Sequence, residues 1–74
     1  MDNNIILGML EEAMDLEPGT LDSVEILEDM NEWDSLSKLS FLSIVKTKTG
    51  KVLSINDIVK FVVVQDVIDY FDEA

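Results

Sequence analysis

Residues 33–50 read WDSLSKLSFLSIVKTKTG, and this stretch decides the fold. Asp34 is a good helix N-cap, because its carboxylate can accept hydrogen bonds from the unpaired N–H groups of a first helical turn. Gly50 is a good helix stop, because glycine adopts the left-handed conformation without steric cost. The apolar residues between them recur at spacings of about three: Leu36, Leu39, Phe41, Leu42, Ile44 and Val45. The stretch therefore predicts an amphipathic helix from Asp34-Ser35 to about Thr49.

Two further long helices are expected on either side of this one. The first runs from about Asn3 to Asp15, with its apolar positions three and four residues apart, and Glu17-Pro18-Gly19 stops it. The last spans about Val64 to Asp72. Its expected buried side chains are Val64, Val67, Ile68 and Phe71, and its expected solvent-facing acids are Asp66, Asp69 and Asp72.

Shorter segments complete the expected elements. A brief helix over about 56–60 would be capped by Ser54 or Asn56. A short strand over 51–53 is an alternative. The run 61–64 has β-propensity, but without a convincing partner strand it is interpreted as a buried linker and helix start.

A long connection, residues 17–33, joins the first two helices. A loop of this length inside a compact domain is usually functional or packed by its own side chains. The residues that we expect to be buried there are Leu21, Val24, Ile26, Leu27 and Met30. The sequence therefore predicts one all-α domain over residues 1–74, a small four-helix bundle with a long first loop and a short third helix.

Composition limits the chemistry that the chain can perform by itself. It has 74 residues with no cysteine and no histidine, so it forms no disulfide and has neither a thiol nucleophile nor the usual general base. We expect a cytoplasmic protein that is not an enzyme and has no catalytic residue. No metal site is expected: Asp29, Asn31 and Asp34 lack the glycine and the bidentate glutamate that a calcium loop requires.

Charge and hydropathy exclude two kinds of partner. The net charge is −11, with eleven acids and no base in residues 1–34, so binding to nucleic acid is not expected. The acids form either a plain solvated surface or a surface that attracts basic partners. The N-terminus has no basic residue ahead of an apolar run, so no signal peptide is expected. The longest apolar runs are too short to cross a bilayer, so no membrane association is expected.

Ser35 is the residue best placed for a chemical modification. A serine at the first position of a helix points into solvent, and the helix N-terminus stabilises an anion placed there. Asp-Ser-Leu taken alone is a weak signal, because many such triplets are ordinary caps.

Three separated features give the chain a resemblance to the acyl carrier proteins. They are the triplet Asp34-Ser35-Leu36 at the head of a helix, the acidic and hydrophobic connection over 16–30, and the final segment 64–71. Together they cover nearly the whole chain, and the distance from Ser35 to the last segment fits without gaps.

The resemblance implies a function. Ser35 would carry a covalent 4′-phosphopantetheine arm, transferred from coenzyme A by a phosphopantetheinyl transferase with magnesium. Acyl-loading and acyl-transfer enzymes would pass acyl or aminoacyl thioesters to and from the arm of this monomeric phosphoprotein. The pathway would be fatty acid, polyketide or polysaccharide biosynthesis. Asp34, Leu36, Ser37 and Ser40 would contact partners.

The chain also departs from the family pattern. Trp33 stands where the family usually has glycine, which points to a specialised Trp-Asp-Ser-Leu branch, and we expect it to be a core aromatic. The helix face that is usually acidic carries Ser37, Ser40, Ser43, Lys46 and Lys48. These residues form either an altered docking face or a plain solvated face. If charge guides docking, acids of the loop or acids of the partner would have to take part. The alternative function is an unmodified carrier-like helical module that acts only in protein–protein interaction.

Overall fold

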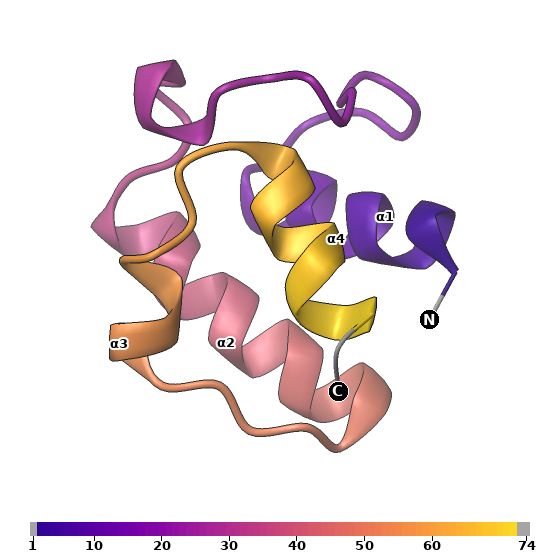
Figure 1. The fold of residues 1–74 in the computed structure, drawn as a ribbon, viewed down its shortest axis with the longest axis vertical. Helices are drawn as coiled ribbons and strands as arrows, with labels where there is room; N and C mark the ends of the chain where they lie inside the picture. The colour runs from indigo at the N-terminus through magenta and orange to yellow at the C-terminus, as the bar shows by residue number, and fades with distance from the viewer. Residues whose placement is uncertain (1, 73–74) are drawn as a thin grey trace.

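Four α-helices and one turn of 3₁₀-helix surround one hydrophobic core in residues 2–72, the part of the chain that the computed structural model describes (Figure 1). In chain order they are α1 (Asn3–Ala13), η1 (Leu27–Asp29), α2 (Ser35–Thr49), α3 (Ile55–Ile58) and α4 (Val64–Asp72). α1 packs against α2 and α4, and α2 packs against α3. The predicted all-α bundle with a long first loop and a short third helix is confirmed, and residues 2–72 contain no strand.

The end of α1 lies earlier than the sequence predicts. The expected end was about Asp15, but the helix ends at Ala13. Asp15 takes a left-handed conformation with φ of 57°, and the N–H of Leu16 donates to the carbonyl oxygen of Glu11 at 2.8 Å. This geometry closes the helix before the chain reaches Pro18.

The connection between α1 and α2 passes over one side of the bundle (Figure 1) and is held by a few of its apolar residues. Leu21 and Leu27 are buried, and Met30 is partly buried against the core. The expectation of burial is wrong for Val24, which is 79% exposed in a turn, and for Ile26, which is 45% exposed.

Residues 61–64 form a linker and helix start, as predicted, but the predicted burial is wrong for Val62, which is 42% exposed. They also have a partner that the sequence did not reveal. Ile26 and Val63 make a single antiparallel β-bridge. The N–H of Val64 donates to the carbonyl oxygen of Glu25 at 3.0 Å. The bridge ties the long connection to the start of α4.

The short elements follow their caps. Ser54 caps α3 through a reciprocal pair of hydrogen bonds with Asp57, so the helix starts one residue earlier than expected. Residues 51–53 are a loop, and the strand alternative is wrong.

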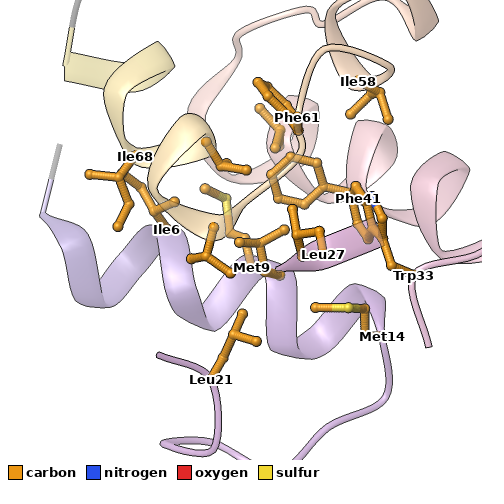
Figure 2. Close-up of a cluster of buried hydrophobic side chains, with 14 of the residues drawn as sticks. Ile6, Met9, Met14, Leu21, Leu27, Trp33, Phe41, Ile58, Phe61 and Ile68 are labelled. Carbon is orange, nitrogen blue, oxygen red and sulfur yellow. The ribbon is translucent and has the colours of Figure 1, made fainter. Parts of the chain in front are cut away.

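The core is assembled from all the helices and the connection (Figure 2). Ile6 and Met9 of α1 meet Ile68 of α4, Leu27 of the connection and Phe41 of α2 there. α4 has the predicted bounds, and its four predicted core residues are all buried. No helix within residues 2–72 is long and apolar enough to span a membrane.

Candidate functional site

The start of α2 is built by a reciprocal capping interaction. Oδ1 of Asp34 accepts a hydrogen bond from the backbone N–H of Ser37 at 2.9 Å. Oγ of Ser37 accepts one from the backbone N–H of Asp34, also at 2.9 Å. The predicted N-cap is confirmed, and two of the unpaired donors at the helix start are satisfied.

Ser37 is buried at this junction, with 5% of its surface exposed. Its hydroxyl donates to the backbone carbonyl oxygen of Glu32 at 2.6 Å, which joins the last turn of the connection to the first turn of α2. The expectation that Ser37 lies on the solvent-exposed face with Ser40 is wrong, because this hydroxyl is used internally. Ser40 is partly exposed and Ser43 is exposed.

Ser35 is exposed and occupies the first position of α2. Its hydroxyl makes no hydrogen bond to any residue in 2–72, unlike that of Ser37. Leu36, the next residue, is 74% exposed. A reagent or an enzyme can therefore reach the Ser35 oxygen, and an apolar side chain stands beside it.

The electrostatics of this end of α2 combine a helix N-terminus with carboxylates. The backbone N–H of Ser37 and then its hydroxyl hold the pKa of Asp34 below its ordinary value of 3.8. A pocket of about 220 Å³ lies between the end of α1 and the start of α2, and Ser35 is not among its lining residues. Its lining residues are Ala13, Met14, Asp15, Glu32, Asp34, Leu36, Ser37 and Ser40.

Trp33, the residue before the N-cap of α2, anchors the start of this helix in the core. It is buried, as predicted, with 6% of its surface exposed. Its ring meets Phe41 of α2 edge to face, with centroids 6.0 Å apart and planes at 71°. Its indole N–H has no hydrogen-bond partner within residues 2–72. This contact fixes the residue that precedes the cap.

The apolar residues of α2 do not all face the core. The predicted apolar face is wrong at Leu36 and at Leu39, which is 57% exposed. A spacing of three drifts around a helix that turns 100° per residue, so Leu36 and Val45 lie about 180° apart. The buried residues are Ser37, Phe41 and Val45, which are four apart.

The acidic surface is left almost unneutralised in the described part of the chain. The one ion pair found within residues 2–72 joins Lys48 Nζ and Glu12 Oε1 at 3.5 Å. No group of three acidic side chains in this range is arranged to hold a metal ion.

The positioning role of Ser37 is not predicted by the apolar pattern, which places this serine on the surface. Asp34-x-x-Ser37 nevertheless has the spacing of a capping box with the two residue types exchanged.

No family model, no curated protein and no solved structure matches the chain.

Proposed function

We propose that the chain is a carrier protein. It holds acyl or aminoacyl intermediates as thioesters on a 4′-phosphopantetheine arm attached to Ser35 Oγ, and delivers them between enzymes of a biosynthetic pathway. The observation that carries the proposal is the state of Ser35, an exposed serine with an unused hydroxyl at the first position of a fifteen-residue helix. The resemblance of Asp34-Ser35-Leu36 to the attachment motif of acyl carrier proteins supports the same residue.

The residues present fit a phosphodiester at this oxygen. The new bond joins Ser35 Oγ to phosphorus, and the bond from that phosphorus to the nucleotide part of coenzyme A breaks. The hydroxyl proton passes to a base of the transferase. The helix N-terminus favours the resulting negative charge. When bound, the arm supplies a thiol, which this chain of 74 residues without cysteine lacks.

The surface around Ser35 fits contact with partner enzymes. Leu36 and Leu39 are exposed apolar side chains on α2, and apolar anchors surrounded by polar residues are typical of binding surfaces. Asp34 and Ser40 remain proposed contacts beside them. Ser37 does not, because its hydroxyl holds the helix start. The acids of the connection, which form no ion pair with another residue in 2–72, favour partners with basic surfaces.

A loading experiment tests the proposal. The protein is incubated with coenzyme A and a phosphopantetheinyl transferase of broad specificity, and its intact mass is measured. We expect a gain of one phosphopantetheine in the wild type and in Ser43→Ala, and none in Ser35→Ala. Ser43 is the matched control because it is an exposed serine on the same helix.

The opposite outcome is equally clear. If several transferases add no mass to protein that circular dichroism shows to be folded, the carrier proposal is wrong. The alternative function, an unmodified helical module in protein–protein interaction, then replaces it.

A further inference from the structure

A second pocket lies between α1 and the beginning of the connection, away from Ser35. Its volume is about 410 Å³, within the range of roughly 300–1,000 Å³ that is usual for small-molecule sites. It is lined by residues of α1 and of the connection: Asn4, Leu7, Gly8, Glu11, Pro18, Gly19 and Leu21. It shares no lining residue with the pocket at the start of α2.

A buried carboxylate is the main polar group of this pocket. Glu11 has 5% of its surface exposed. Its Oε2 accepts hydrogen bonds from the backbone N–H groups of Gly19 and Leu21, each at 3.0 Å. Its Oε1 accepts none from residues 2–72. Oε2 therefore fixes the side chain, whereas Oε1 is not a buried atom and is open to a donor from outside residues 2–72.

Gly8 forms part of the wall of this pocket. A Cβ placed on Gly8 would meet no atom within 4 Å, so the space beside this glycine is open. A larger side chain can therefore be placed at this position of the wall without a clash at its Cβ.

The charge and the walls define the ligand. Residues 1–34 contain no lysine or arginine, and the ion pair of Lys48 is with Glu12, not with Glu11. The walls beside the carboxylate include the apolar side chains of Leu7 and Leu21, and the polar residue Asn4 also lines the pocket. We infer that this pocket binds a primary alkylammonium ion, with its N–H groups on Glu11 Oε1 and its short alkyl chain between α1 and the connection.

An NMR titration of the full chain tests the inference, with n-butylammonium as the probe. We expect saturable shifts of the backbone amide signals of Leu7, Gly8 and Gly19. Butyrate, which has the opposite charge, should leave them in place. Tetramethylammonium, which has the charge but no N–H donor, should bind at least about tenfold more weakly.

Two variants locate the binding. Gly8→Leu fills the pocket without changing charge, and Glu11→Gln removes the charge but keeps an amide oxygen as acceptor. Each should raise the Kd for n-butylammonium at least about tenfold. Glu12→Gln, the matched control, removes the same charge from a neighbouring exposed residue and should leave the Kd unchanged.

Glu11→Gln could loosen the connection, because Glu11 accepts two of its hydrogen bonds. In that case Gly8→Leu tests the binding site, because this substitution keeps the Glu11 carboxylate. Shifts that grow without saturation, or an unchanged Kd in folded Gly8→Leu, would overturn the inference. The site does not depend on the carrier proposal: Ser35→Ala should bind n-butylammonium as the wild type does.

Discussion

α2 and α4 use their apolar residues in different ways. In α4 the apolar pattern and the burial coincide: Val64, Val67, Ile68 and Phe71 are all buried. In α2 the buried face holds Phe41 and Val45, whereas Leu36 and Leu39 point into solvent. α4 is thus a structural helix. α2 divides its apolar residues between the core and an exposed surface that includes Leu36, the residue next to Ser35. The proposed carrier function would use this exposed surface for partner contact.

The largest effect should come from the buried side of α2. Phe41→Ala removes a fully buried ring and should lower the free energy of unfolding by about 3–5 kcal/mol. Leu39→Ala on the same helix should change it by less than about 0.5 kcal/mol, because Leu39 is exposed. Urea denaturation followed by circular dichroism measures both. Equal losses in the two variants would mean that α2 is as fully buried as α4.

The next effect separates two serines of α2. Ser37→Ala leaves the carbonyl oxygen of Glu32 and the N–H of Asp34 without this partner at a partly buried junction. It should therefore cost about 1–2 kcal/mol. Ser40→Ala, with no such bonds, should stay within about 0.5 kcal/mol of the wild type. Urea denaturation measures the free energy of unfolding of both variants. If Ser37→Ala leaves this free energy unchanged, Ser37 does not position the start of α2.

The bounds of α2 and α4 could be predicted because their signals are local. Asp34 and Gly50 mark the ends of α2, and the apolar spacing of α4 fits one helix face. Apolar residues three apart predict the wrong faces of α2, because its buried positions are four apart. Ser37 is buried because it bonds to Glu32, and apolar patterning cannot detect a polar residue that a neighbouring segment buries.

Two features outside α2, the β-bridge and the burial of Glu11, could not be predicted because they depend on contacts between separate segments of the chain. The bridge between Ile26 and Val63 joins segments distant in the sequence, so neither segment shows it alone. Glu11 reads as one more solvated acid of an amphipathic helix until the connection folds back onto it. The attachment role of Ser35 rests on a motif and stays a prediction, although its exposure at the helix start was expected and is confirmed.

A kinetic difference should set Leu36 apart from the surface of α4. Leu36→Ala should leave stability within about 0.5 kcal/mol of the wild type. It should lower kcat/KM of the transferase about fivefold, a loss of about 1 kcal/mol of transition-state stabilisation. Gln65→Ala, at an exposed position of α4, should change neither. Initial rates of phosphopantetheine incorporation provide the measurement, and equal rates in the two variants would contradict a contact role for the outward face of α2.

The smallest effect concerns the carboxylate at the start of α2. Hydrogen bonds from the backbone N–H and then the hydroxyl of Ser37 hold the pKa of Asp34 below 3.8. Because the folded state lowers this pKa, the stabilisation is fully present above the unfolded value of 3.8 and is lost as the pH falls through the folded value. Stability should therefore decline on acidification below pH 3.8, and less so in Asp34→Asn.

The neighbouring capping box supplies an internal control for this titration. The pKa of Asp57 is also lowered, first by the backbone N–H of Ser54 and, less strongly, by its hydroxyl. NMR titration of the side-chain carboxyl carbons follows both acids in one sample. In Ser37→Ala the pKa of Asp34 should rise while that of Asp57 stays in place, and Ser54→Ala should give the reverse. If neither variant moves its own acid, backbone N–H groups alone depress both pKa values. The hydroxyl of Ser37 would then serve only to tie Glu32 to the helix, which leaves its packing role at the start of α2 intact and removes its electrostatic one.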